Sequence, residues 1–219
     1  MTRQQLMQGL ILSAQSYEDS QPRCSGQRVC LVKDPASGVE YAVHRRGSLL
    51  TIVFRGTDSP ADWRSNFCFA RKVIPYDNES TRIRVHEGFL NAYKSPRVRK
   101  NILGLVDSST QKVRITGHSR GAALAVLCGL DIQYHHPDCC LEVLLFGCPR
   151  VGNEAFARSY NKRVFTTFNV RCGNDIVTHL PPALLGYRHV GVQVNIGPRR
   201  ILPSALDHLP RRYCQYLLE

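Results

Sequence analysis

The sequence has no internal repeat, no low-complexity tract and no long linker, so nothing in it separates one folding unit from another. It is 219 residues long and 43% hydrophobic, which is enough for one well-buried core but short for two independent domains. We therefore expect a single domain over residues 1–219.

The sequence also lacks a long apolar run near its start. Leu6, Leu10, Ala14 and Tyr17 recur at helical spacing, which predicts an amphipathic helix that covers a sheet. Glutamines interrupt this segment, and no long apolar run follows it. The sequence therefore predicts neither a signal peptide nor a transmembrane segment.

No two cysteines have the C-x-x-C spacing of common zinc sites. The nine cysteines, an odd number without an expected secretory signal, indicate reduced thiols and an intracellular location, cytoplasmic or peripheral at membranes. His135, His136, Cys139 and Cys140 form the one cluster with the side chains of a zinc site. They lie at an expected helix end beside Pro137, so we favour incidental thiols and expect no bound metal.

Acidic residues are few, 17 against 29 basic residues, and the net charge is +12. Basic residues recur at Arg71 and Lys72, Arg82 and Arg84, 94–100, Arg199 and Arg200, and Arg211 and Arg212. If several share one face, that face favours peripheral contact with an anionic membrane, at about 1 kcal/mol per charge near the surface. A solvated basic surface is the alternative. Nucleic acid is a weaker candidate, because no recognised binding module accompanies the charge.

Strand and helix patterns alternate along most of the chain. Runs at 29–32, 39–43 and 49–54 are typical of strands, and the short turns between them predict antiparallel hairpins. The later segments are a helix at 89–106 with a break near Pro96, a strand at 113–116, a helix at 121–135, a strand at 141–146, a helix at 153–160 and a strand at 164–170. This order predicts an α/β fold with a mostly parallel central sheet, an antiparallel N-terminal edge and helices on both faces.

The segment Gly117-His118-Ser119-Arg120-Gly121 places a serine between two glycines where an apolar strand meets an apolar helix. The glycines leave room for adjoining backbone, so the serine can hold a strained conformation with its hydroxyl exposed. The helix N-terminus then supplies N–H groups to an oxyanion formed at an attacked carbonyl. The pattern predicts a nucleophilic Ser119, with a purely structural glycine turn as the alternative.

A serine hydroxyl becomes a nucleophile when a histidine accepts its proton and a carboxylate orients that histidine. Asp175 follows the strand expected at 164–170, at the sheet edge where active-site residues gather. His208 is the last histidine of the chain, and we predict it as the general base with Asp175 as its acid. Asp207 and His189 are the alternatives: neighbouring residues usually point apart, and His189 lies in an alternating run at 187–196 typical of a strand. His118 and His179 are expected to pack or hydrogen-bond nearby.

Five ordered blocks carry a family resemblance: 51–58 (TIVFRGTD), 85–89 (VHEGF), 117–125 (GHSRGAALA), 146–153 (FGCPRVGN) and 174–182 (NDIVTHLPP). From about Leu49 to His208, the chain resembles the class 3 lipases, the fungal-lipase-like branch of the α/β-hydrolases. The resemblance implies an α/β-hydrolase fold and a serine hydrolase that cleaves fatty-acyl esters of lipids, of the triacylglycerol lipase or phospholipase type. It implies an acyl-enzyme intermediate and no cofactor.

The resemblance also assigns further residues. Thr57 and the backbone N–H of Arg120 would form the oxyanion hole, and His86 would be structural. Arg120 stands where the family usually has leucine, and a charged side chain beside the acyl site would alter headgroup preference. The interval from Asp175 to His208 is short for the family.

Residues 59–74 fall where lipases of this family carry a lid. Trp63, Phe67 and Phe69 give this segment an apolar side, as in a flap that covers an acyl groove in water and opens on lipid. A fixed surface helix with aromatic residues in the core is the alternative. For the whole protein, the alternatives are an esterase, thioesterase or acyltransferase for a soluble acyl substrate, and a non-catalytic lipase-like binding domain.

Overall fold

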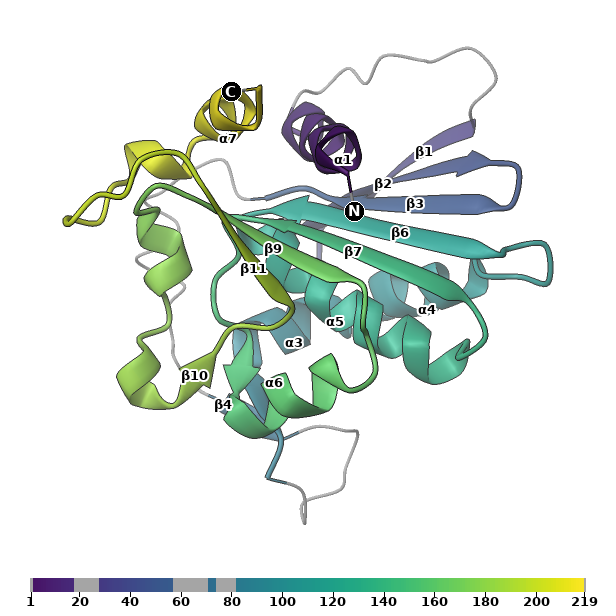
Figure 1. Ribbon diagram of the computed structural model, residues 1–219. Helices are drawn as coiled ribbons and strands as arrows, with labels where there is room; N and C mark the ends of the chain where they lie inside the picture. Colours follow the sequence, from purple (N-terminus) through teal and green to yellow (C-terminus); the bar gives the residue numbers. More distant parts are fainter. Residues whose placement is uncertain (1, 18–27, 57–70, 74–81, 219) are drawn as a thin grey trace.

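A computed structural model describes residues 2–17, 28–56, 71–73 and 82–218. They form a seven-stranded central sheet with helices on both faces (Figure 1), the α/β-hydrolase architecture expected from the sequence. The sheet has the order β1-β2-β3-β6-β7-β9-β11. Its strands are β1 Arg28–Asp34, β2 Val39–Arg46, β3 Leu49–Phe54, β6 Lys112–His118, β7 Cys140–Phe146, β9 Thr167–Cys172 and β11 Val192–Ile196.

The N-terminal edge of the sheet is antiparallel, as predicted. Two hairpins join β1, β2 and β3, and their turns contain Gly38 and Gly47 at φ values of 62° and 56°, which favour glycine. From β3 onward the pairs are parallel, so β3, β6, β7 and β9 bring their carboxyl ends to one edge. Functional residues of open α/β sheets gather at that edge.

Helices cover both faces of the sheet (Figure 1). Helices α1 (Arg3–Gln15) and α7 (Pro210–Leu218) pack against each other and over β6, β7 and β9, around Leu10, Phe146 and Tyr213. The other face carries α3 (Glu87–Tyr93), α4 (Pro96–Gly104), α5 (Arg120–His135) and α6 (Glu154–Asn161). Helix α5 is buried along most of its length, in keeping with its run of small apolar residues.

A second, antiparallel sheet has the order β10-β8-β5-β4. Its strands are β4 Arg71–Val73, β5 Arg84–His86, β8 Gly152–Asn153 and β10 Tyr187–Arg188. The run at 187–196 was expected as one strand, and that expectation is wrong. It is divided between β10 in the small sheet and β11 in the main sheet, with Gly191 at a φ of 73° between them. A Cβ at Gly191 would lie 2.5 Å from the Thr167 side chain, a contact that the local pattern does not reveal.

Within the described part of the chain, no helix is long and apolar enough to cross a membrane.

Candidate active site

Ser119 lies at a tight turn between β6 and α5. Its φ of 61° and ψ of −130° make it the sole described non-glycine residue with a positive φ. A Cβ at Gly117 would lie 2.4 Å from the Gly121 backbone, and a Cβ at Gly121 would lie 2.4 Å from the carbonyl oxygen of Phe54. The two glycines therefore permit the close approach of strand and helix that holds Ser119 in this conformation.

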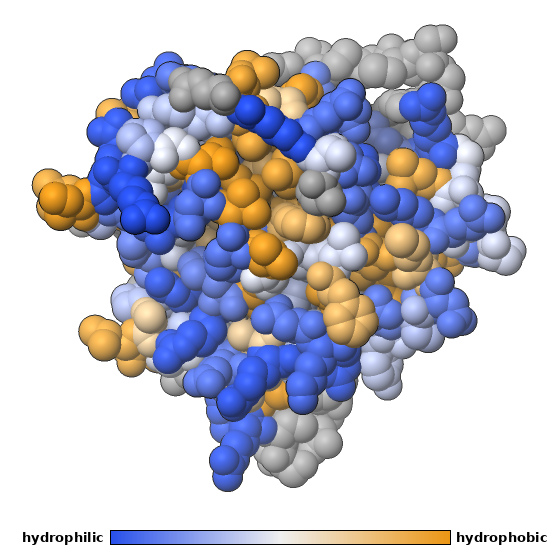
Figure 2. Space-filling view, in the orientation of Figure 1, coloured by the Kyte–Doolittle hydropathy of each residue, from blue (hydrophilic) through white to orange (hydrophobic). Residues whose placement is uncertain are grey.

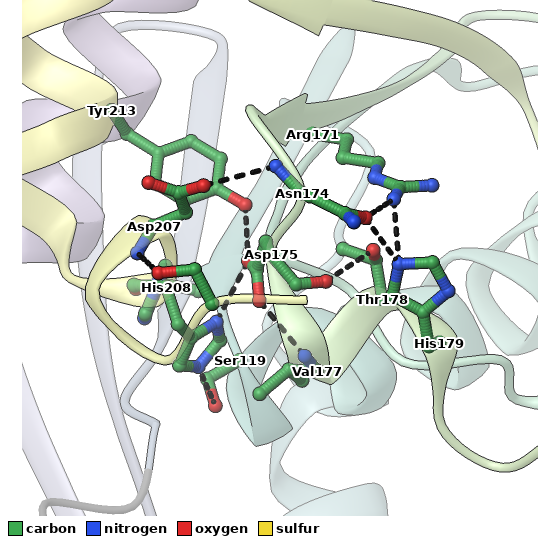
Figure 3. A network of polar contacts seen from close by, with 12 residues as sticks. Ser119, Arg171, Asn174, Asp175, Val177, Thr178, His179, Asp207, His208 and Tyr213 are labelled. Atoms are coloured by element: carbon green, nitrogen blue, oxygen red, sulfur yellow. Dashed lines mark hydrogen bonds and ion pairs between the residues drawn. The ribbon is translucent and has the colours of Figure 1, made fainter. Parts of the chain in front are cut away.

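The side chains of Ser119, His208 and Asp175 form a hydrogen-bonded chain (Figure 3). His208 Nε2 lies 2.9 Å from Ser119 Oγ, and His208 Nδ1 lies 2.8 Å from Asp175 Oδ2. An ionised carboxylate can only accept hydrogen bonds, so Nδ1 carries the proton and Nε2 is left to accept the serine hydroxyl proton. This arrangement can move a proton from Ser119 to His208 and stabilise the resulting imidazolium.

Asp175 is fully buried at the start of a 3-10 helix, η1 (Ile176–His179). Burial by itself raises the pKa of its carboxyl, but hydrogen bonds from His208, from Tyr213 and from the backbone N–H of Val177 outweigh that effect. The pKa of Asp175 is therefore lowered, and the carboxylate stays charged beside His208. Burial and the charge of Asp175 raise the pKa of Tyr213, which keeps its hydroxyl a donor.

His118, next to Ser119 in the chain, supports His208 from the side. Its Nε2 lies 2.8 Å from the backbone carbonyl oxygen of His208, and its Nδ1 lies 2.9 Å from the Tyr17 hydroxyl. The two imidazole rings lie 4.5 Å apart at 30°. Burial, followed by the charge of His208, lowers the pKa of His118 to about 3. His118 is therefore neutral and holds the backbone of the general-base candidate, in keeping with the packing expected of it.

Asp207, the alternative acid, does not contact the imidazole of His208. Its carboxylate accepts a hydrogen bond of 3.0 Å from the backbone N–H of Asn174 and lies 3.4 Å from Arg200 Nε. The Asn174 side chain in turn contacts Arg171 and His179, as seen in Figure 3. These contacts fix the loop that carries Asp175.

Nothing in the sequence indicates that three further residues belong to this site. Tyr213 reaches Asp175 from α7, and Tyr17 reaches His118 from the turn after α1. Gly147, after β7, has a φ of 57°, and a Cβ there would lie 2.8 Å from Asp175 Oδ2 and 3.0 Å from His208. The FGCPRVGN block contains this glycine, but the block does not indicate what lies against it.

The remaining histidines lie outside the hydrogen-bonded chain. His86, the last residue of β5, caps the N-terminus of α3, where its Nδ1 accepts a hydrogen bond from the Phe89 N–H. His189 lies between β10 and β11 rather than within a strand, and its Nε2 donates to the carbonyl oxygen of Thr178 at 2.8 Å. In the described segments, no three histidine, cysteine or carboxylate side chains are placed to hold a metal ion.

Several predicted residues lie outside the described residues: Thr57, Trp63, Phe67 and Phe69, with most of the expected lid at 59–74. Arg120 is described, and it opens α5, where backbone N–H groups of the first turn have no partner within the helix. Its guanidinium donates to the carbonyl oxygens of Ser37 and Gly38 in the turn between β1 and β2. The Arg120 side chain is therefore engaged with that turn.

Comparison with known proteins identifies relatives over most of the chain. The family model for class 3 lipases matches residues 51–185. A lipase of Rhizomucor miehei is 37% identical over 150 residues, which cover 64% of this chain and 39% of the relative. The secreted mono- and diacylglycerol lipase 1 of Fusarium solani is 31% identical over 157 residues, which cover 69% of this chain and 45% of the relative. The chain therefore spans less than half the length of these curated relatives.

A solved triacylglycerol lipase, described as having a serine protease triad as its catalytic centre, shares the fold with a TM-score of 0.81 and 26% identity. The match covers 94% of this chain and 92% of that one. The likeness to this solved lipase therefore extends beyond residues 51–185, which the family model matches.

The intracellular location expected from the cysteines is wrong, because the Fusarium solani relative is a secreted lipase and such relatives point to an extracellular location. Part of the argument from the thiols also loses its basis in the structure, although Cys30 and Cys140 are exposed free thiols. Cys128, Cys148 and Cys172 are free but buried, and burial raises the pKa of each thiol. Buried thiols of this kind are inert, so their reduced state does not report a reducing compartment.

Proposed function

The chain belongs to the class 3 lipase family, and on that premise we propose that it hydrolyses fatty-acyl esters of lipids with Ser119, His208 and Asp175 as its catalytic residues. The observation that carries the proposal is the hydrogen-bonded chain from Ser119 Oγ through His208 to Asp175, at 2.9 and 2.8 Å, on a strained turn before α5. Ester hydrolysis by such a constellation needs no cofactor.

In the proposed reaction, Ser119 Oγ attacks the ester carbonyl carbon while its proton passes to His208 Nε2. The tetrahedral intermediate collapses, the bond to the alcohol oxygen breaks, and His208 returns the proton to the departing alcohol. Water then attacks the acyl-serine ester with His208 as the base, which releases the fatty acid and restores the Ser119 hydroxyl. Asp175 keeps the proton of neutral His208 on Nδ1, and it stabilises the imidazolium form of His208.

The backbone N–H of Arg120 and the residue Thr57 are proposed to bind the oxyanion. Arg120 directly follows the nucleophile and begins α5, so its N–H belongs to the positive end of the helix dipole. Each such donor contributes on the order of 3 kcal/mol to transition-state stabilisation. Thr57 enters this proposal through the family resemblance, as does a lid at residues 59–74.

The proposed setting is the surface of an extracellular lipid aggregate. The relatives named above include a secreted mono- and diacylglycerol lipase, and the net charge of +12 favours a surface that carries anionic lipid. Activity on lipid would then rise with anionic lipid content and fall with salt, because salt screens exposed charge.

A fluorophosphonate probe tests the nucleophile. We expect the wild-type protein to react with the probe and to hydrolyse p-nitrophenyl esters of short and long acyl chains, and both reactions to vanish in Ser119→Ala. A jump in rate when the long ester passes its micellar threshold would indicate a lipase, whereas equal rates on monomers and micelles would indicate an esterase for soluble substrates. A folded wild-type protein that neither reacts nor turns over ester, with or without detergent, would contradict the proposal.

A further inference from the structure

The loop between β11 and the 3-10 helix η3 (Leu206–His208) carries two large apolar side chains in solvent. Ile201 is 97% exposed and Leu202 is 77% exposed. Arg199 and Arg200 precede them, and we call residues 199–202 the 199–202 tip. The loop projects from the edge of the molecule in Figure 1, and Figure 2 shows hydrophobic atoms protruding at the same edge, next to hydrophilic ones.

Buried polar groups hold this loop in place. The Asn174 side chain donates to the carbonyl oxygen of Ile201 at 3.0 Å, and the Ser204 N–H donates to the backbone carbonyl oxygen of Asn174 at 2.9 Å. The Ile176 N–H donates in turn to the carbonyl oxygen of Ser204 at 3.2 Å. These contacts, one at Ile201 within the 199–202 tip and two at Ser204 after it, fix the loop while the apolar side chains of the tip remain in water, where they contribute nothing to the core.

The positive charge of the tip indicates which kind of apolar surface it would enter. Arg199 and Arg200 are exposed, and Arg200 Nε forms an ion pair with Oδ2 of the buried Asp207 at 3.4 Å. Adjacent arginine and aliphatic side chains suit an interface in which the guanidinium groups meet anionic headgroups and the aliphatic groups enter the acyl region. A neutral protein surface would contact the aliphatic side chains but would offer no anionic partner to the guanidinium groups.

The tip also adjoins the proposed catalytic residues. Ile176 follows Asp175, Leu206 precedes His208 by two residues, and both are large apolar side chains that remain exposed. The same Asn174 that holds Ile201 precedes Asp175 in the loop after β9. A lipid surface into which the tip inserted would therefore lie next to the segments that carry Asp175 and His208.

We infer that the 199–202 tip inserts into an anionic lipid surface and orients the site toward it. This inference rests on the proposed function, because it names the surface through which that function meets its lipid. Ile201 and Leu202 supply the apolar contact, and Arg199 supplies most of the preference for anionic headgroups, because Arg200 is already paired with Asp207.

Vesicle binding by the full chain carrying Ser119→Ala tests the inference without turnover. Ile201→Ser with Leu202→Ser should weaken sedimentation with phosphatidylglycerol vesicles by about 100-fold, since each buried aliphatic side chain contributes about tenfold or more. Arg199→Gln should weaken it by about fivefold at low salt and by less at high salt. Phosphatidylcholine vesicles should bind the parent protein more weakly than phosphatidylglycerol vesicles.

Phe165→Ser is the matched control. Phe165 is also exposed, at 80%, but it precedes β9 and so lies at the opposite edge of the sheet from Asp175, which follows that strand. This variant should bind vesicles like the parent protein. Thermal unfolding of each variant establishes that it is folded before vesicle binding is compared.

Fluorescence locates the tip directly. Emission added by Leu202→Trp should be quenched by vesicles with brominated acyl chains, whereas emission added by Phe165→Trp should not. Absence of quenching at position 202, or equal binding by the double variant and its parent, would overturn the inference. Loss of self-association in the double variant with unchanged vesicle binding would instead assign the tip to a contact between copies, and would also overturn it.

The fluorophosphonate reaction of the wild-type protein keeps the two proposals distinguishable. A protein that reacts through Ser119 but binds vesicles independently of the tip retains the hydrolase proposal and loses this inference. A protein that binds through the tip but never reacts loses the hydrolase proposal.

Discussion

Asp175 and Asp207 both lie close to His208 in the sequence or the fold, but only the Asp175 carboxylate contacts its imidazole ring. Asp175→Asn should lower kcat on a soluble ester by about 10⁴-fold with little change in KM, because the amide favours the wrong tautomer of His208. Asp207→Asn should lower kcat by less than about tenfold, since Asp207 holds the backbone of Asn174 and not the ring. Steady-state kinetics of both folded variants make the comparison, and equal losses would contradict the assignment of Asp175.

Tyr213 acts on the site through Asp175 and should not touch substrate. Tyr213→Phe keeps the ring in place and removes one donor to the carboxylate, so we expect kcat to fall by about tenfold with KM unchanged. The lost hydrogen bond to a charged group should also lower the free energy of unfolding by about 1.5–3 kcal/mol.

Tyr160→Phe is the control for Tyr213→Phe. The Tyr160 hydroxyl is buried against Thr167 at 2.9 Å, on α6 and away from the site. Its loss should lower the free energy of unfolding without lowering kcat. If both variants lost activity in proportion to their stability, Tyr213 would have no separate positioning effect.

At the scale of elements, the turn between β6 and α5 depends on backbone contact rather than on side-chain packing. A Cβ at Gly117 would lie 2.4 Å from the Gly121 carbonyl carbon and 2.8 Å from the Ala122 nitrogen. Gly117→Ala should therefore lower the free energy of unfolding by about 3 kcal/mol or more and abolish the fluorophosphonate reaction.

Gly104→Ala should have the opposite effect on the free energy of unfolding. Gly104 is the last residue of α4 and nothing lies within 4 Å of its Cβ position, so alanine should raise the free energy of unfolding by about 0.5–1 kcal/mol. Urea unfolding measures both variants. An unchanged urea midpoint in Gly117→Ala would show that strand and helix do not need their close approach.

At the scale of the whole molecule, buried histidines make the stability depend on pH. Burial lowers the pKa of His118 to about 3 and the pKa values of His86 and His189 to about 4, against about 6.5 in the unfolded chain. Below pH 6.5 the unfolded chain binds protons that the folded protein does not, so stability falls as the pH falls. Each of these histidines should lower the free energy of unfolding by about 2 kcal/mol between pH 7 and pH 5.

Urea unfolding at pH 7 and pH 5 measures this loss. His189→Gln should reduce the difference between the free energies of unfolding at the two pH values by about 2 kcal/mol. Asp175 does not contribute in this window. The pKa of its carboxyl is lowered, so its stabilising effect is complete above about pH 4 and is lost only at lower pH. If the free energy of unfolding were the same at pH 7 and pH 5, that result would contradict the burial of neutral histidines.

Local pattern was sufficient for most of the main sheet. The strand expected at 49–54 is β3 with the same bounds, the break near Pro96 separates α3 from α4, and the helix expected at 121–135 begins one residue earlier as α5. These elements follow from apolar periodicity, glycine turns and proline, which act between neighbours in the chain. The division of 187–196 did not follow, because it depends on the contact between Gly191 and Thr167.

The sequence by itself determined the family and most of the order of elements, and it was enough to propose Ser119, Asp175 and His208 as catalytic, because each is expressed in short motifs such as the one around Ser119. Tertiary structure decided which carboxylate meets His208, and it brought Tyr17, Tyr213 and Gly147 to the site from separate elements. It also decided that Ile201 and Leu202 point into solvent. Contacts of this kind join residues distant in the chain, so their energies depend on packing directions that no local pattern contains.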